Sequence, residues 1–171
     1  MDLLDAYIQM SPDRGQEPPP YLLFIGEGDQ RKILEERART MNWSSIKFLG
    51  FRNQTELPGY YDLGDVLVLP SAFEPWGLVI NEVMNAGRAV IVSDQVGCGP
   101  DLVKGVENGY IFKAGDIAGL RQALVNLLGE PQKCQAMGQK SLEIIATWGL
   151  EEDVAGLNQA LAYVTKKQPA G

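Results

Sequence analysis

Short apolar runs alternate with segments of helical periodicity along most of the chain. The runs are rich in aliphatic and β-branched residues, as buried strands are, and they lie at residues 21–26, 46–50, 65–70, 88–93 and 110–113. Segments with apolar residues every three or four positions follow them at residues 29–41, 56–63, 77–86, 101–104 and 117–128. Strands that alternate with helices at this pace form right-handed crossovers and a parallel sheet covered on both faces. The pattern predicts an α/β fold with a Rossmann-like parallel sheet, and Asp29 is the expected N-cap of the helix that begins beside it.

Both ends of the chain are predicted to be helical. Apolar residues from Leu3 to Ile8 have helical spacing, and prolines predict a surface loop over residues 11–20. The last three helices are expected at residues 117–128, 132–147 and 151–165, and together they form a helical C-terminal segment. We interpret their apolar stripes, together with Met84 and Met137, as core. This predicts a domain over residues 1–165 and a frayed tail over residues 166–171.

Composition limits the classes of function. The 171 residues are 45 % hydrophobic and 22 % charged, enough for one well-buried domain. The net charge of -7 argues against nucleic acid as a partner, because nucleic-acid binders concentrate Lys and Arg on one face. Histidine is absent, which excludes a Ser-His-Asp relay and an imidazole metal ligand within this chain. The sequence predicts no transmembrane segment, and the two cysteines and the acidic N-terminus favour a reduced, cytoplasmic setting.

The stretch F-E-P-W-G-L-V-I-N-E, residues 73–82, follows a predicted strand and begins a helix. In parallel α/β sheets, ligands lie beyond the carboxyl ends of strands, where helix N-termini present free N–H groups. Pro75 stiffens the turn, and Gly77 leaves the amides of Gly77 and Leu78 open to a phosphate or a sugar hydroxyl. Glu74 and Glu82 are too far apart to share a proton, so each can accept hydrogen bonds from a separate diol. A nucleoside diphosphate sugar has two such groups, with anions between them.

Ordinary structural roles are the alternative to a nucleotide-sugar site for these residues. Taken singly, Glu74 and Glu82 are exposed acids of a loop and a helix, and Phe51 is a loop aromatic packed on its own strand. Gly26 and Gly28 suggest a dinucleotide site, but Arg31 stands where the third glycine is needed. Cys98 lies between two glycines without a histidine to activate it, which favours a small turn residue over a nucleophile.

Nearly the whole chain resembles one enzyme family. The segment from Pro70 to Asp94 is similar to the signature of the retaining glycosyltransferases of family four, group 1, in which two Glu are separated by seven residues after a strand that ends in Pro-Ser. The segments I-G-E-G, F-L-G-F, Y-Y-D-L-G-D, V-G-C-G-P-D-L-V and N-G-Y-I-F-K-A-G-D resemble further family patterns, in the same order and spacing. The resemblance implies half of the two-domain B-type fold, namely the C-terminal donor-binding domain. It also implies sugar transfer from a nucleotide diphosphate sugar with retention of configuration, without a cofactor or a required metal.

Residue roles follow from the same resemblance. Glu74 corresponds to the catalytic carboxylate that holds the hydroxyls of the donor sugar, the amides around Gly77 and Leu78 meet sugar and phosphate oxygens, and Glu82 binds the ribose. In the same way, Phe51 and Arg52 lie where the family's loop meets the base. The nucleotide, the sugar and the acceptor stay open.

Two parts of the family pattern are absent. The chain is expected to begin after the first strand of the donor-binding domain and to need an N-terminal acceptor domain as a partner. Because that strand is central, its loss would leave two unpaired edges, at residues 22–25 and 66–69. The basic pair that meets the diphosphate is absent too, and no phosphate-binding role falls to Arg31 or Lys32. Two hypotheses remain: the donor-binding half of a glycosyltransferase that is inactive alone, or a stand-alone module that binds nucleotide sugars or a partner without catalysis.

Overall fold

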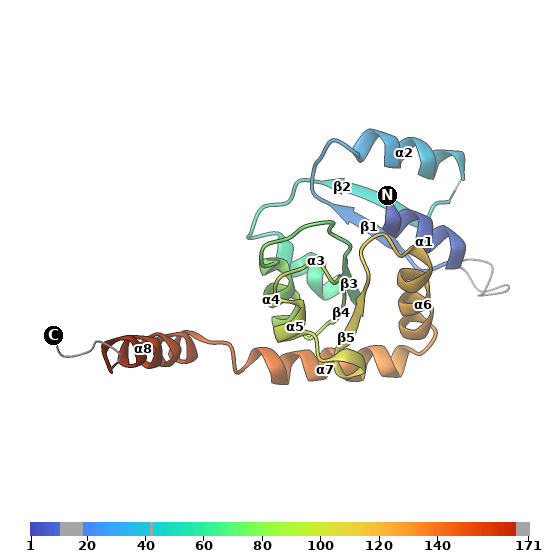
Figure 1. The fold of residues 1–171 in the computed structure, drawn as a ribbon. Coiled ribbons are helices and arrows are strands. Elements are labelled where there is room, and N and C mark those ends of the chain that lie inside the picture. The colour runs from blue at the N-terminus through green and yellow to red at the C-terminus, as the bar shows by residue number, and fades with distance from the viewer. Residues whose placement is uncertain (11–18, 42, 167–171) are drawn as a thin grey trace.

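A computed structural model describes residues 1–10, 19–41 and 43–166 of the chain. Five strands and intervening helices follow the predicted order (Figure 1). The strands are β1 (Leu22–Ile25), β2 (Ile46–Gly50), β3 (Val66–Leu69), β4 (Ala89–Ser93) and β5 (Gly109–Phe112). The helices are α1 (Asp2–Met10), α2 (Arg31–Thr40), α3 (Leu57–Leu63), α4 (Leu78–Asn85), α5 (Gly99–Leu102), the 3₁₀ turn η2 (Gly105–Glu107), α6 (Ile117–Leu128), α7 (Pro131–Ile145) and α8 (Leu150–Lys166). The tail beyond Lys166 and most of the proline-rich loop, residues 11–18, lie outside the described residues.

All described strand pairs are parallel, as the sequence predicts, but they form two sheets instead of one. β1 pairs with β2, and β3 pairs with β4, which pairs with β5. Neither β1 nor β3 has a second strand partner among the described residues. These are the two edges that loss of a central strand was expected to leave.

Helices cover the strands from both sides (Figure 1). On one side α1 packs along α6, and their buried residues share a core with side chains of β1, β2, β4 and β5. On the other side α4, α5 and α7 enclose a second core over β3 and β4, which contains Ile80, Met84 and Leu102. β4 lies between both cores, and its five residues are all buried. Met84 and Met137 are buried, which confirms their interpretation as core.

Local sequence explains some helix starts. The Asp116 side chain accepts a hydrogen bond of 2.9 Å from the Gly119 amide and caps α6. The expected cap of α2 is wrong: Gln30, not Asp29, precedes the first helical residue, and it makes no side-chain capping hydrogen bond. α5 also begins earlier than predicted, at Gly99, because Pro100 suits the first turn of a helix.

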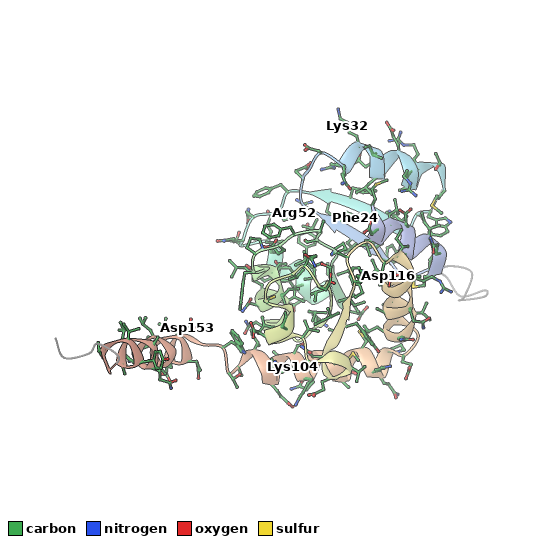
Figure 2. All side chains as sticks on the ribbon, viewed as in Figure 1. Phe24, Lys32, Arg52, Lys104, Asp116 and Asp153 are labelled. Carbon is green, nitrogen blue, oxygen red and sulfur yellow. The ribbon has the colours of Figure 1, made fainter. Side chains whose placement is uncertain are left out.

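The apolar stripe of the last helix is exposed, contrary to the prediction that it belongs to the core. Gly149 follows α7, and α8 then points away from the domain (Figures 1 and 2, where Asp153 marks it). Its side chains are exposed from Glu151 to Thr165, and Leu157 is 60 % exposed. Periodicity indicated that this segment is an amphipathic helix, but it did not indicate which surface covers the apolar face.

In the part of the chain that the structure describes, every helix is too short or too polar to cross a bilayer.

Matched leucine substitutions should separate the core from α8. Leu120 of α6 is fully buried in the core shared with α1, so Leu120→Ala should lower the free energy of unfolding by about 2–5 kcal/mol. Leu157→Ala on α8 should change it by less than about 0.5 kcal/mol. Urea unfolding followed by circular dichroism measures both. Equal losses for the two variants would show that α8 is packed in solution.

Candidate functional site

Glu74 is held by its backbone in the loop after β3. Its amide donates to the Gln95 carbonyl at 3.0 Å, and its carbonyl accepts from the Gly97 amide at 2.9 Å. The Cys98 amide then donates to the Trp76 carbonyl at 2.9 Å. The loop after β3 therefore continues the parallel pairing of β3 with β4 beyond the strands themselves. These hydrogen bonds fix the backbone position from which the half-buried Glu74 side chain extends. Its Oε1 lies 3.4 Å from the Trp76 amide.

Two glycines allow this loop to form. A Cβ on Gly97 would lie 1.9 Å from the Pro75 carbonyl oxygen, so no side chain fits there. Gly77, the N-cap of α4, has φ +97°, in the left-handed region that L-residues avoid. A Cβ on Gly77 would also lie 3.0 Å from Val96 Cγ1. Gly77 has no capping side chain, so the first amides of α4, next to the exposed Leu78, have no side-chain partner there, a local arrangement that suits an anion.

Glu82 is exposed on α4 and is joined to α3. The Tyr61 hydroxyl donates to Glu82 Oε2 at 2.5 Å. The pKa of Tyr61 is raised well above its usual range, mainly by burial and to a lesser extent by the hydrogen bond to Glu82. The phenol therefore keeps its proton and remains a hydrogen-bond donor. One carboxylate oxygen of Glu82 is thereby fixed, and the other has no partner among the described hydrogen bonds and ion pairs.

The loop after β2 also contacts α3. The Phe51 ring is 73 % exposed, so it does not pack on its own strand. The Arg52 guanidinium lies 5.3 Å from the Tyr60 ring centroid and 3.7 Å from Glu56 (Figure 2). Two adjacent tyrosines of α3 thus contact two predicted site residues: Tyr60 contacts Arg52, and Tyr61 contacts Glu82. This brings the loop after β2 and α4 together around α3.

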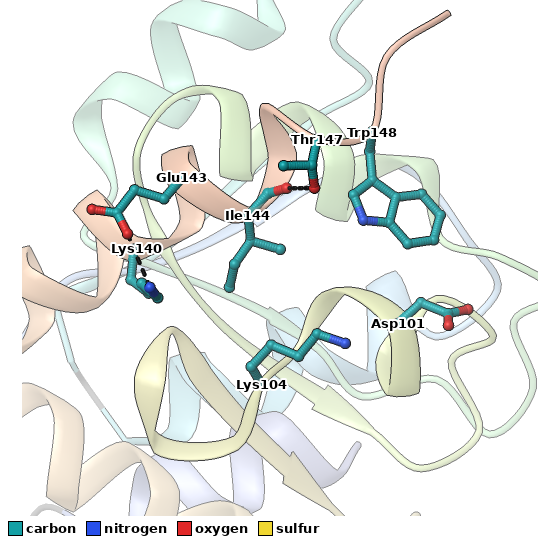
Figure 3. Close-up of a pocket in the computed structure, with 7 residues that line it drawn as sticks. All are labelled: Asp101, Lys104, Lys140, Glu143, Ile144, Thr147 and Trp148. Atoms are coloured by element: carbon teal, nitrogen blue, oxygen red, sulfur yellow. Dashed lines mark hydrogen bonds and ion pairs between the residues drawn. The ribbon is translucent and has the colours of Figure 1, made fainter. Parts of the chain in front are cut away.

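Two hollows are found in the described part of the surface, and neither is lined by Glu74 or Glu82. The larger, about 480 Å³, lies between α5 and the end of α7, with Lys104, Thr147 and Trp148 in its wall (Figure 3). The Trp148 ring is 5.9 Å from the ring of Trp76, which connects this hollow to the Glu74 loop. The smaller, about 190 Å³, lies at the carboxyl end of β1. That Glu74 and Glu82 bind the two diols of one nucleotide sugar stays a prediction.

Other candidates have structural roles. Arg31 bonds Glu35 at 2.8 Å and also pairs with Glu27, contacts that raise its pKa. Glu27 thus places a carboxylate beside the Gly26 turn, where a dinucleotide would need room for phosphates. Cys98 is fully buried, and burial raises the pKa of its thiol to about 11, which suits a packed turn residue. Among the residues described, no cluster of three or more His, Cys, Asp or Glu is placed to hold a metal ion.

A family model described as "Glycosyl transferases group 1" matches residues 2–143. The chain belongs to this family. Glycogen synthase from Mycobacterium tuberculosis is 33 % identical over 132 residues, which cover 77 % of this chain and 32 % of that enzyme. Sulfoquinovosyl transferase SQD2 from Arabidopsis thaliana is 30 % identical over 129 residues, which cover 74 % of this chain and 24 % of that enzyme. The chain therefore spans about a third or less of these relatives.

Solved glycosyltransferases share the fold. The C-terminal domain of the group 1 protein LpcC from Francisella tularensis superposes with a TM-score of 0.75 at 25 % identity, covering 85 % of this chain and 76 % of that one. HepE from Anabaena, in complex with UDP and glucose, superposes with a TM-score of 0.74 at 25 % identity, covering 98 % of this chain and 44 % of that one. The architecture is thus the Rossmann-like α/β half of a B-type glycosyltransferase fold, as the resemblance implied.

Three contacts of this glycosyltransferase domain had no counterpart in the sequence reasoning. They are Tyr61 to Glu82, Arg52 to Tyr60, and Trp148 to Trp76. The Y-Y pair belonged to the pattern that carries the resemblance, so a signal for the first two existed. Trp148 follows α7, more than seventy residues after Trp76, and no spacing rule connects them.

Glycine substitutions test the turn at the start of α4. Gly77→Ala places a Cβ at positive φ against Val96, so it should lower the free energy of unfolding by about 1–3 kcal/mol. Gly59→Ala in α3 meets no atom within 4 Å at an ordinary φ, so it should raise stability by about 0.4–1 kcal/mol. Urea titrations of both variants give the two values. If Gly77→Ala were as stable as the parent chain, the left-handed turn would not form in solution.

Proposed function

We propose that the chain is the donor-binding domain of a retaining glycosyltransferase that transfers a hexose from a nucleotide diphosphate sugar and acts together with an N-terminal acceptor domain. The observation that carries the proposal is the family match over residues 2–143, with Glu74 in the loop before α4 and Gly77 as the N-cap of that helix. Support for the donor comes from HepE, whose structures hold UDP, UDP and glucose, or UDP-glucose. No bound metal is required, and the cytoplasm is the expected compartment.

Different residues would contact different parts of the donor. Phe51 and Arg52 would contact the base, and Glu82 would accept the ribose hydroxyls with the oxygen that Tyr61 leaves free. The first amides of α4 would meet the diphosphate and the sugar, since a helix N-terminus favours anions. Glu74 would hold the sugar hydroxyls at the reacting end, on a loop fixed by hydrogen bonds to residues 95–98.

Reconstitution tests the function. The chain is mixed with labelled sugar nucleotides and candidate acceptors, with and without a separately expressed N-terminal domain of a group 1 relative. Transfer only with both parts supports the proposal, and the anomeric coupling constant of the product reports retention. Nucleotide-sugar binding without transfer in any combination would favour the alternative, a stand-alone binding module.

The Glu74 carboxylate should matter more for transfer than for binding. In the reconstituted enzyme, Glu74→Gln keeps the size but removes the anionic acceptor, so kcat should fall roughly 10- to 100-fold. The nucleotide dissociation constant should change far less, because the base and the ribose do not contact Glu74. The control is Glu36→Gln, an exposed acid on α2. Equal kcat for Glu74→Gln and the control would remove Glu74 from the site.

The chain alone should bind nucleotide weakly and transfer no sugar. Its contacts would be a few hydrogen bonds worth about 1 kcal/mol each, which corresponds to a roughly millimolar dissociation constant. No second domain excludes water or holds the acceptor. Calorimetric titrations with UDP, GDP and ADP measure the affinity. Micromolar binding, or transfer by the chain alone, would contradict this expectation.

A further inference from the structure

Glu82 is an exposed carboxylate on α4 that a neutral phenol orients. The Tyr61 hydroxyl donates to Glu82 Oε2 at 2.5 Å, and no Lys or Arg in the described ranges pairs with this acid. A cation in that place would neutralise the acid. A phenol that keeps its proton fixes one carboxylate oxygen and leaves the negative charge as it is. Glu82 is therefore a charged acceptor with a set orientation.

The core, and not Glu82, sets the position of the Tyr61 hydroxyl. The Tyr61 ring is 8 % exposed and belongs to the buried cluster that contains Ile80 of α4. Arg88, in the turn between α4 and β4, donates to the Asp62 carbonyl at 2.9 Å and holds the end of α3 against α4 (Figure 1). The exposed Glu82 side chain thus has a donor that cannot move with it.

The charge on Glu82 limits what this acid can bind. Leu78, the first residue of α4, lies one helical turn before Glu82, and its amide is one of the free donors at the start of the helix. A carboxylate that no cation neutralises repels a phosphate and attracts donors without negative charge, such as hydroxyls. One turn of α4 therefore presents a place for an anion beside a place for hydroxyls, as the phosphate and the sugar of a nucleotide require.

α3 also brings the expected base contact next to the expected sugar contact. The Arg52 guanidinium lies 5.3 Å from the centroid of the Tyr60 ring, and Tyr61 is the next residue. Consecutive Cα atoms are about 3.8 Å apart, so one short stretch of α3 supports both groups. In a nucleoside the base and the sugar are joined by a single bond. The sugar that reaches Glu82 is then the one attached to the base.

We propose that Tyr61 is a positioning residue that makes Glu82 select nucleotides built on ribose over nucleotides built on 2′-deoxyribose. The inference rests on the proposed function, in which Glu82 meets the sugar of the nucleotide. It narrows the donor to one class, a ribonucleoside diphosphate sugar.

Selection follows from the single carboxylate oxygen that Tyr61 leaves open. Because Oε2 is bonded to Tyr61, the 2′ and 3′ hydroxyls of a ribose share Oε1, whose two lone pairs accept both. This requires Oε1 to stay at one place between the two hydroxyls. A 2′-deoxyribose supplies only one of these bonds. Without Tyr61 the exposed carboxylate turns freely and meets one hydroxyl or water equally well, so the preference for ribose is lost.

Titrations of the full chain with matched nucleotides test the proposal. UDP, GDP and ADP are each paired with the analogue that lacks the 2′ hydroxyl, and NMR chemical shifts follow binding at millimolar concentrations. The parent chain should bind its preferred ribonucleotide about 10-fold more tightly than the 2′-deoxy analogue, because one hydrogen bond to a charged group is lost. The quantity compared between variants is this ratio of dissociation constants.

Tyr61→Phe removes one oxygen and keeps the ring in its core. The ratio should fall to about 2-fold or less in this variant, because Glu82 loses its fixed donor. The matched control is Tyr21→Phe, an exposed tyrosine before β1, which should keep the parent ratio. A merely structural role of Tyr61 would weaken both nucleotides alike and leave the ratio unchanged. An unchanged ratio in Tyr61→Phe would overturn the proposal.

Glu82→Gln tests whether Tyr61 acts through this acid. The substitution lies on the surface and should also reduce the ratio to about 2-fold or less. Adding Tyr61→Phe to it should change the ratio no further, because residues that act through one group are not additive. A further fall in the double variant, or a parent ratio in Glu82→Gln alone, would overturn the proposal. The second result applies even if Tyr61→Phe does not fold.

Failure of this inference differs from failure of the proposed function. A parent chain that binds none of UDP, GDP and ADP contradicts donor binding itself, and the role of Tyr61 fails with it. A parent chain that binds a ribonucleotide and its 2′-deoxy analogue equally leaves donor binding intact and overturns only the role of Tyr61.

Discussion

The packing of α1 along α6 holds this domain together. The sheet of β1 and β2 is too small to be stable alone, because a two-stranded sheet is marginal in water. α1 joins the two sheets: it contacts β2 through Tyr7 and α2 through the Asp5–Arg37 ion pair, and its apolar face packs on α6. α6 in turn covers β5 through Leu120 and Leu124. One helix pair therefore replaces the continuity that backbone hydrogen bonds give an unbroken sheet.

The candidate site lies on the three-stranded sheet and depends on a different constraint. Its acidic loop, residues 73–77, is bonded along its backbone to residues 95–98. The close approaches of Pro75 to Gly97 and of Val96 to Gly77 explain why two motifs twenty residues apart in the sequence both contain glycine. Glu74 is thus positioned by β3 and β4, whose pairing is independent of the open edges. The fold can tolerate a divided sheet without disturbing this part of the site.

Sequence reasoning predicted the elements well because their signals are local. Apolar runs bounded by glycine or proline gave the five strands, and the spacing of apolar residues gave every long helix. It was wrong where the outcome depends on distant neighbours. The α8 stripe looks like core, but no described surface covers it, and Asp29 looks like a cap, but the helix begins after Gln30. The site residues were identified from a motif. The contact of Glu82 with Tyr61 follows from how α3 packs on α4, and that of Arg52 with Tyr60 follows from how the loop after β2 lies against α3; the spacing of residues along the chain encodes neither.

The adjacent tyrosines of α3 suggest how the parts of the site act together. The raised pKa of Tyr61 keeps its hydroxyl protonated over the whole physiological pH range, so it remains a hydrogen-bond donor to Glu82. Tyr60 holds the Arg52 guanidinium through its ring, an interaction that leaves several Arg52 donors for other groups. Because consecutive residues of a helix point in different directions, one short helix can position the loop after β2 and the acid of α4 independently. A ligand that contacts both would then bind groups whose positions are already set, and it would lose less conformational entropy on binding.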